Sequence, residues 1–203
     1  MRAVNLRELK RSRTRQALVD AAYELFADKG FEATTIADIA ARAEVGKRTF
    51  FSYFPTKEDV LFPESDARVR VALAAIADRQ PEESPADVLL RALAEAGDAG
   101  DDLTGPLAAM RLELTEQVDS VRGRALQMQW EAQRSIARHL AAAYPSELDE
   151  VSAAALVGAF VGAISGALMT LLREPAHRTD PATIQSSVRR ATDLALRPWR
   201  GKG

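Results

Sequence analysis

The stretch from Thr34 to Lys57 constrains this chain most, because it predicts two short helices that meet at a tight turn. Apolar residues in its first half recur at the spacing that buries one side of a helix, namely Ile36, Ile39, Ala40 and Ala43. Thr35 can cap the start of that helix, and Asp38, three residues later, can bond back to the cap and suits the positive end of the helix dipole. The first half therefore predicts a capped helix.

The second half begins with the turn Glu44-Val45-Gly46 and predicts a helix from about Lys47. Val45, Phe50 and Phe54 are expected to face the interior. The opposite side then carries two cations, a hydroxyl and two aromatic rings, from Lys47, Arg48, Thr49, Phe51 and Tyr53. Groups of this kind bind base edges and phosphates. The pattern indicates a DNA-reading helix-turn-helix.

Residues 13 to 61 resemble the TetR (tetracycline-repressor-like) family of bacterial transcriptional regulators. The resemblance is carried by Lys29-Gly30-Phe31, Thr34-Thr35, residues 36–40, residues 48–55 and Lys57-Glu58. With the outward side of the second helix, it gives a predicted DNA-contacting set of Thr34, Thr35, Gly46, Lys47, Arg48, Thr49, Phe51, Tyr53 and Lys57. In this set, Thr34, Tyr53 and Lys57 are phosphate contacts chiefly on the resemblance.

Two positions depart from the family pattern. Glu44 stands where the family has a glycine in the turn, and Gly46 stands where a serine caps the recognition helix. Gly46 is an acceptable cap, whereas Glu44 is expected to adopt a positive φ at some cost in strain. Its negative charge predicts some loss of phosphate affinity.

Simpler roles stay open for several of these residues. Thr34 could serve only as a cap partner, and Lys47 and Arg48 could be solvated charges. The first 15 residues form a basic N-terminal arm with a local balance of +5. Such an arm either contacts phosphates or the minor groove, or is a solubilising tail.

Composition excludes several classes of protein. The chain has 203 residues, 47% of them hydrophobic, and no cysteine, which excludes disulfides, cysteine-ligated metals and thiol nucleophiles. The net charge of −2 permits DNA binding only through a local basic surface. The basic N-terminus lacks the apolar core of a secretion signal, and a cytoplasmic location is expected.

The helical patterns predict an all-α protein of about nine helices in two domains. Residues 1–60 form a three-helix helix-turn-helix domain with the basic arm, and residues 61–203 form a helical ligand-binding and dimerisation domain. The first helix is expected from residue 13 to about 29. A helix that starts after Pro55 and runs toward residue 79 is expected to bend at Pro63, where a break between two packed helices is the alternative.

The second domain offers candidate ligand contacts. Helices are predicted over about 85–97, 106–118 and 121–143, the last with apolar stripes on two sides that indicate a helix sandwiched beside a pocket. The candidate pocket residues are Met110, Arg111, Leu114, Trp130, Gln133 and Phe160. Arg111 needs an anionic partner, which is either Glu113 or Glu116 or the acid of a ligand. For any single one of these residues, ordinary core packing is the alternative.

Residues 151–172 carry no charged side chain, so a transmembrane helix has to be weighed. We reject it because twelve of these residues are Ala, Gly, Ser or Thr, which gain little from lipid. Glycines that repeat every four residues allow another helix to approach closely. In TetR-type proteins the last two long helices form the dimer interface. The resemblance thus predicts interface residues Gly158, Gly162, Gly166, Ile184 and Val188.

The sequence therefore predicts a homodimeric repressor that binds a palindromic DNA operator and is released by a small, lipophilic effector. The alternatives are a constitutive DNA-binding protein without effector, or a helical carrier or enzyme. No catalytic residues, metal site, cofactor or membrane partner are expected, since only His139 and His177 are available and they lie in different segments. Effector, operator, target genes and the choice between repressor and activator are not readable from the sequence.

Overall fold

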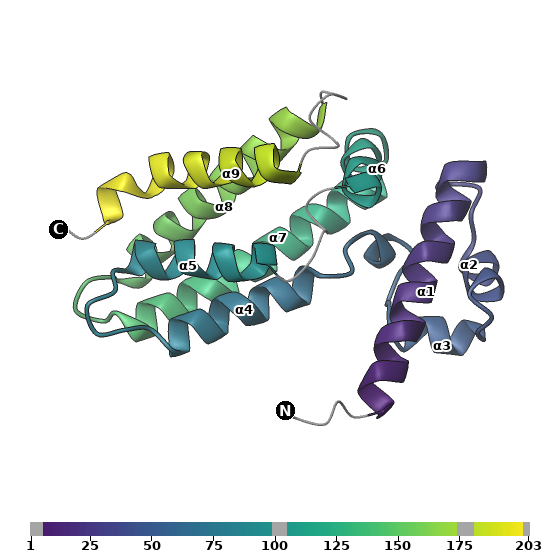
Figure 1. Cartoon of the computed structure of the whole chain (residues 1–203), viewed down its shortest axis with the longest axis horizontal. Coiled ribbons are helices and arrows are strands. Elements are labelled where there is room, and N and C mark those ends of the chain that lie inside the picture. The colour runs from purple at the N-terminus through teal and green to yellow at the C-terminus, as the bar shows by residue number, and fades with distance from the viewer. Residues whose placement is uncertain (1–5, 99–104, 174–180, 201–203) are drawn as a thin grey trace. The chain divides into compact units, whose positions relative to one another are not determined.

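The computed structural model describes residues 6–98, 105–173 and 181–200, and these residues form only helices, turns and loops (Figure 1). The predicted all-α fold is confirmed, with nine α-helices in the described part of the chain. The chain divides into two compact units, residues 1–63 and residues 64–203.

The first unit contains three α-helices and a short 3-10 helix: α1 (Leu6–Lys29), α2 (Ile36–Arg42), α3 (Lys47–Phe51) and η1 (Glu58–Leu61). α1 packs against α2 and η1, and α2 packs against α3. The core of this unit consists of Leu18, Ala22, Phe26, Phe31, Ile39, Ala40, Phe50, Phe54, Val60 and Leu61, each at most 5% exposed. Gly30, at φ 85°, ends α1 in the left-handed conformation that glycine adopts without strain.

The start of α1 differs from the prediction. We expected the helix to begin at residue 13, but it begins at Leu6, so the described part of the basic arm is helical. The apolar pattern used to find the helix begins only at Leu18, because the preceding two turns carry no core residue. Periodicity alone misses such an extension.

At Pro63 the chain has a break between two helices, so the predicted bend is wrong and the alternative is confirmed. η1 ends at Leu61, and α4 starts afresh at Ser65. A residue before proline is pushed out of the helical region by its clash with the proline ring, and Phe62 accordingly has φ −123° and ψ 52°. Pro63 thus separates two helices.

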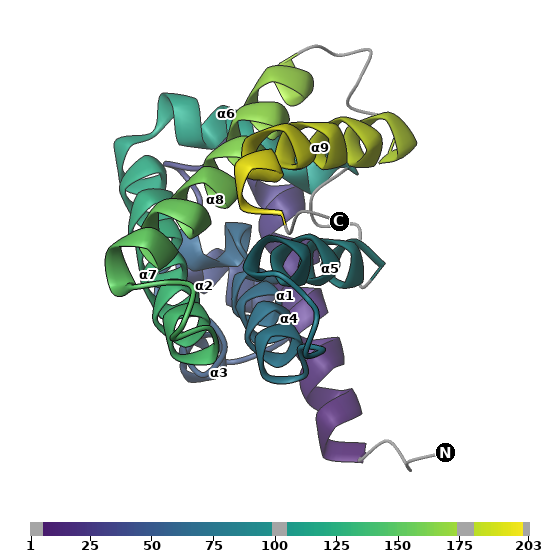
Figure 2. The same cartoon turned by 90° about the vertical axis from the view of Figure 1, so that its left-hand side faces the viewer.

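The second unit contains six α-helices and a terminal 3-10 helix: α4 (Ser65–Ala77), α5 (Pro85–Asp98), α6 (Gly105–Gln117), α7 (Asp119–Ala143), α8 (Glu150–Arg173), α9 (Pro181–Leu196) and η3 (Arg197–Trp199). α4, α5, α9, α8 and α7 form a ring in which each helix contacts the next and α7 returns to α4 (Figure 2). α6 packs against α7 and α8. The interior of the ring holds one large apolar core, with Leu89, Leu140 and Leu156 completely buried.

Part of the predicted packing of α7 is wrong. The helix was expected to be sandwiched, but Leu126 and Trp130 are each 59% exposed. The buried side of α7 instead carries Val121, Ile136 and Leu140. An apolar stripe in the sequence therefore marks either a core contact or an exposed apolar surface.

A polar cluster ties the α4–α5 connection to the end of α7. The Arg91 guanidinium donates to both carboxylate oxygens of Glu83, at 2.7 and 2.9 Å, and to the carbonyl of Ala75. The Tyr144 hydroxyl donates to the backbone carbonyl of Glu83 at 2.9 Å. The hydrogen bond from Arg91 lowers the pKa of Glu83, and burial raises the pKa of Tyr144 to about 12.

Candidate nucleic-acid interface

The start of α2 is fixed by the predicted capping box. The Thr35 amide donates to the Asp38 carboxylate at 2.9 Å, and the Asp38 amide donates to the Thr35 hydroxyl oxygen at 3.2 Å. Lys29 adds an ion pair to the same carboxylate at 2.9 Å, and its hydrogen bond is the main cause of the lowered pKa of Asp38. The predicted cap is confirmed, and it uses the Thr35 side chain internally.

The turn between α2 and α3 has the predicted geometry. Glu44 has φ 55°, a conformation that costs strain in a non-glycine residue. The Val45 amide donates to the Ala40 carbonyl at 2.9 Å and closes the turn onto α2. Gly46 is the N-cap of α3, with extended backbone and no side-chain cap. The turn is therefore closed by a backbone hydrogen bond, without a side-chain cap on α3.

α3 separates an interior side from an exposed side. Phe50 is completely buried and the Phe54 ring lies beside it, with centroids 5.8 Å apart. Lys47 and Arg48 are exposed, and the Phe51 ring is 52% exposed. The α3 surface thus presents two cations and an aromatic ring on a helix held from behind by two buried rings.

Thr34 does not face the surface. The residue is 1% exposed, and its hydroxyl donates to the carbonyls of Gly30, at 2.8 Å, and Leu25, at 3.3 Å. The prediction of a phosphate contact by its side chain is therefore wrong. The threonine instead bonds to the carbonyl of Gly30, just past the end of α1, and to that of Leu25 in the last turns of the helix.

Lys57 has a similar internal role. Its ammonium group donates to the carbonyls of Phe31, at 2.8 Å, and Thr34, at 3.0 Å, and lies 4.1 Å from the centroid of the Phe31 ring. Because an ammonium has three donors, one remains for an outside acceptor. The main role of Lys57 is therefore structural, because its hydrogen bonds connect the start of η1 to the segment between α1 and α2.

Arg15 has a structural role that its place in the basic arm did not predict. Its guanidinium lies 4.4 Å from the centroid of the Phe54 ring and donates to the carbonyls of Tyr53, at 3.3 Å, and Pro63, at 2.5 Å. Arg11, one turn earlier, lies over the Tyr53 ring at 5.9 Å. The spacing of Arg11 and Arg15 could have predicted these contacts, because both residues lie on the side of α1 that carries the core residue Leu18.

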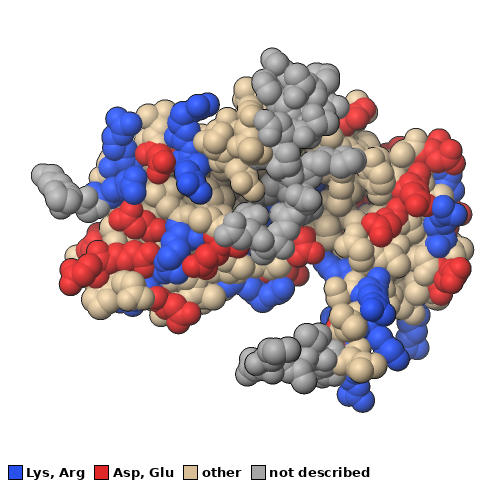
Figure 3. Space-filling view, viewed as in Figure 1, with Lys and Arg blue, Asp and Glu red and all other residues tan. Residues whose placement is uncertain are grey.

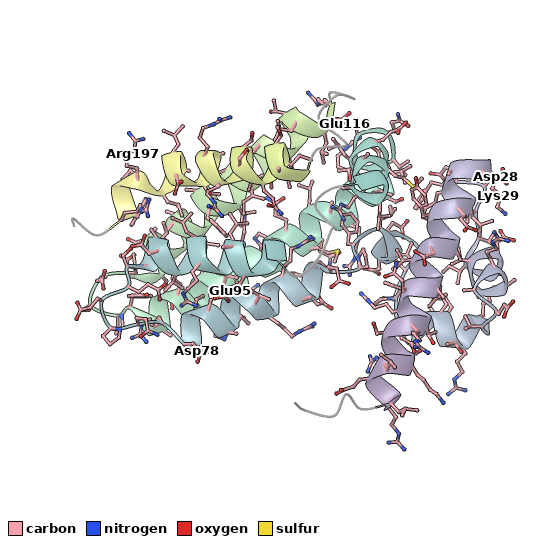
Figure 4. All side chains as sticks on the ribbon, in the orientation of Figure 1. Asp28, Lys29, Asp78, Glu95, Glu116 and Arg197 are labelled. Carbon is pink, nitrogen blue, oxygen red and sulfur yellow. The ribbon has the colours of Figure 1, made fainter. Side chains whose placement is uncertain are left out.

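Cations of the first unit are concentrated at one end. They are exposed on the first turns of α1, at Arg7, Lys10, Arg11 and Arg13, and at the start of α3, whereas the exposed Lys29 and Arg42 are paired with Asp38 and Glu24. Figure 3 shows them gathered over that end of the unit. Asp28 and Lys29 lie at the other end of α1, as Figure 4 shows. The electrostatic surface is therefore local, as DNA binding requires.

The predicted ligand contacts are dispersed in the second unit. Met110, Arg111, Leu114 and Gln133 are half-buried. Trp130 is on the surface, and Phe160 is 6% exposed within the packed core. Glu116, considered above as a partner for Arg111, accepts a bond of 2.7 Å from Arg173, and Figure 4 places it on α6. A described surface depression along α9 is lined by residues between Ala182 and Arg197 and includes none of the six.

The predicted interface residues fall into two groups. Gly158 is half-buried, Gly162 and Gly166 are exposed, and a Cβ atom added at any of the three would meet nothing within 4 Å beyond the adjoining residues and the helix's own backbone. Ile184 and Val188 are only 1% and 5% exposed because they pack on Ala108 and Leu172 within the same subunit. Their assignment to the dimer interface is therefore wrong, since neither side chain has surface left for a partner.

α8 has an unusual surface for a helix of a packed bundle. Val151 is 77% exposed and Met169 is 46% exposed, and they border the line of glycines. In the described residues α8 is the one helix long and apolar enough to cross a membrane, and 22% of its most apolar window is buried. Its outer side is thus apolar and smooth.

Comparison with known proteins agrees with this geometry. Residues 18–62, from the core part of α1 to the end of η1, match the profile of the bacterial regulatory proteins of the tetR family. The chain is 33% identical over 150 residues to the HTH-type transcriptional regulator TcmR of Streptomyces glaucescens, an alignment that spans 71% of this chain and 66% of TcmR. It is 37% identical over 86 residues to the HTH-type transcriptional repressor LfrR of Mycolicibacterium smegmatis, 42% of this chain and 44% of LfrR.

Solved structures share the fold over most of the chain. A TetR-family transcriptional regulator of Syntrophomonas wolfei has a TM-score of 0.61 at 16% identity, covering 92% of this chain and 96% of its own. Thermus thermophilus FadR, a TetR-family repressor in complex with lauroyl-CoA, has a TM-score of 0.56 at 21% identity, covering 93% and 96%. The chain belongs to the TetR family of bacterial regulatory proteins.

Proposed function

We propose that the protein is a sequence-specific DNA-binding transcriptional regulator that acts in the cytoplasm as a homodimer and represses its target genes. The observation that carries the proposal is the exposed surface of α3, where Lys47, Arg48 and Phe51 project from a helix whose back is fixed by Phe50. An arginine or lysine in a groove donates to guanine, and an aromatic ring contacts the thymine methyl group. The names of the relatives TcmR and LfrR support the same function.

The corrected set of DNA contacts follows from exposure. Lys47 and Arg48 read base edges or bind phosphates, Phe51 packs on a base, and Thr49 and Tyr53 contact the backbone from half-buried positions. Gly46, exposed at the start of α3, adds an anion-binding position. The Thr35 amide is already bonded to the Asp38 carboxylate, so Thr35 contributes only through its exposed position beside α2. Thr34 no longer belongs to this set, and Lys57 contributes at most its remaining donor.

We propose that the second unit dimerises through the outer side of α8. Glycines at Gly158, Gly162 and Gly166 with open space around them let a second α8 approach to backbone distance, and Val151 and Met169 then become buried. Two subunits related by a two-fold axis present two copies of α3, which fits an inverted-repeat operator. A partner subunit, and not lipid, is the proposed cover for this apolar helix.

We further propose that an effector binds within the second unit and weakens DNA binding. Met110 and Leu114 offer half-buried apolar contacts, which favours a small lipophilic effector. Affinities for effector and operator are then coupled through one equilibrium, because a ligand that favours the released state must lose affinity when DNA is bound.

Selection from a pool of random double-stranded DNA by the purified protein at about 150 mM salt tests the proposal. We expect an enriched inverted repeat with half-sites about one helical turn apart, about 34 Å. A single enriched half-site would contradict dimeric reading. The absence of any enriched sequence from ligand-free protein, verified by mass spectrometry, would contradict sequence-specific binding.

A further inference from the structure

The first three turns of α1 lie outside the region that matches the family profile, which begins at Leu18. Within the core, one line of α1 carries Leu18, Ala22 and Phe26, all at most 5% exposed. The same line continues toward the N-terminus with Arg15 and then further cations at intervals of four residues. The apolar side of the helix thus becomes a basic side where the helix extends past the core.

This basic side is rigidly attached to the segment that follows the recognition helix. Arg15 holds the carbonyls of Tyr53 and Pro63 and lies on the ring of Phe54, and Arg11 lies over the Tyr53 ring. The extension is therefore held in a fixed orientation relative to the end of α3. A charged surface with a fixed position can bind phosphates with less loss of conformational entropy than a flexible tail.

The extension, residues 6–13, is strongly basic and exposed. Arg7, Lys10, Arg11 and Arg13 are all exposed, and Glu8 is the only acidic residue in this range. At 1.5 Å per residue the eight residues span about 12 Å, which is the length of three to four steps of a DNA strand at about 3.4 Å each. The size and charge of this surface therefore match a short run of DNA phosphates.

We propose that residues 6–13 of α1 form a second DNA-binding surface, which binds the phosphate backbone beside the groove that α3 reads. The inference rests on the proposed function and adds a contact that lies outside the helix-turn-helix. Phosphate contacts position a protein without reading sequence, so this surface raises affinity for all DNA and leaves discrimination to α3.

The test compares two variants of the full-length protein that lose the same charge. The test variant carries Lys10→Gln, Arg11→Gln and Arg13→Gln, and the control carries Arg70→Gln, Arg134→Gln and Arg138→Gln at exposed positions of the second unit. Glutamine is a good helix former, so both variants are expected to keep the wild-type circular dichroism. Binding to the selected duplex and to a scrambled duplex is measured from about 50 to 200 mM salt.

We expect the plot of log K against log salt to become shallower by about 0.9 for each phosphate contact that is lost, or about 2 to 5 for two subunits. The test variant should bind both duplexes at least about 10-fold more weakly near physiological salt, with an unchanged ratio between them. The control should stay within about two-fold of the wild type, the size expected for distant surface charges screened by salt.

Equal slopes for the test and control variants would overturn the inference. Loss of binding to vesicles of anionic phospholipid, without loss of DNA binding, would also overturn it and identify a membrane-facing helix, since Leu6 and Leu9 are 71% and 42% exposed. If Arg48→Ala abolishes discrimination while the test variant behaves as the control does, the proposed function stands and this inference fails. A wild-type protein that binds neither duplex would refute both.

Discussion

The first unit exposes cations along α1 and α3, whereas the second unit exposes apolar side chains and glycines along α7 and α8. The interior polar groups of the first unit are bonded to backbone carbonyls, as Thr34, Lys57 and Arg15 illustrate. Lys10, Arg13, Lys47 and Arg48 are exposed at its surface, where a polyanion can reach them. The outer side of α8 suits a second apolar surface. The first unit thus has a surface that suits a polyanion, whereas the second has a surface that suits an apolar partner.

Replacement of Phe50 by alanine should have the largest effect and should separate the two units. Phe50 is completely buried, and loss of such a ring costs about 3–5 kcal/mol, a large part of the stability of a small unit. Both tryptophans, Trp130 and Trp199, lie in the second unit. Denaturation followed by circular dichroism should therefore gain an early phase, while the midpoint followed by tryptophan fluorescence stays unchanged. A fluorescence midpoint that falls equally would mean that the units unfold together.

Gly162→Arg tests the partner proposed for α8. The subunit leaves open space at Gly162, so the variant should fold normally, but two arginines at a close helix contact should raise the dimer dissociation constant by at least about 100-fold, or about 2.7 kcal/mol. Gly123→Arg is the matched control, because Gly123 on α7 is also exposed with open space around it. Sedimentation of both variants over a range of concentrations gives the result. A Gly162→Arg protein that stays a tight dimer would remove α8 from the interface.

Two lysines of the first unit sharpen the distinction between interior and surface cations. Lys57→Met removes two hydrogen bonds from a charged donor and should lower the free energy of unfolding by about 1–3 kcal/mol. Lys47→Met removes an exposed charge and should change stability by less than about 0.5 kcal/mol while weakening DNA binding. Thermal unfolding and duplex binding measured on both variants check this. The opposite order of stabilities would show that Lys57 is a surface residue in solution.

The smallest effect concerns acid stability of the second unit. Because the bond from Arg91 lowers the pKa of Glu83 below its ordinary value of 4.5, the pair stabilises the fold above that pH, and the stabilisation is lost as pH falls through the lowered pKa. Glu83→Gln should be less stable than the wild type at pH 7, by about 1 kcal/mol, and the difference should shrink toward pH 3. Fluorescence-monitored unfolding at several pH values measures it. A constant difference would exclude the carboxylate charge as its cause.

Local patterns in the sequence predicted the helix-turn-helix well. The cap formed by Thr35 and Asp38, the positive φ of Glu44 and the burial of Phe50 all follow from residues within a few positions of one another. Capping boxes and left-handed turns depend on local geometry, so they can be predicted from neighbouring residues without knowledge of the fold.

The errors arose where distant segments meet. Lys57 bonds to carbonyls 26 and 23 residues away, and no periodicity reveals which backbone acceptors lie near a lysine. The family resemblance placed Ile184 at a dimer interface, but its side chain packs into the subunit's own core. Trp130 was assigned to the interior because it falls on an apolar stripe, and it lies outside. Hydrophobic pattern identifies an apolar side without identifying what covers it.

The exposed surface of α3 is the central claim, and discrimination between the selected duplex and a scrambled duplex tests it most directly. The ratio of the two dissociation constants is measured for the wild type, for Arg48→Ala and for Arg42→Ala, whose exposed side chain pairs with Glu24 on the surface of the same unit. Loss of a guanine contact in both half-sites should reduce the ratio at least about 10-fold in Arg48→Ala, since one such contact is worth about 1–3 kcal/mol, and should leave it unchanged in Arg42→Ala. A ratio for Arg48→Ala equal to that of the wild type would contradict the assignment of α3 as the reading helix.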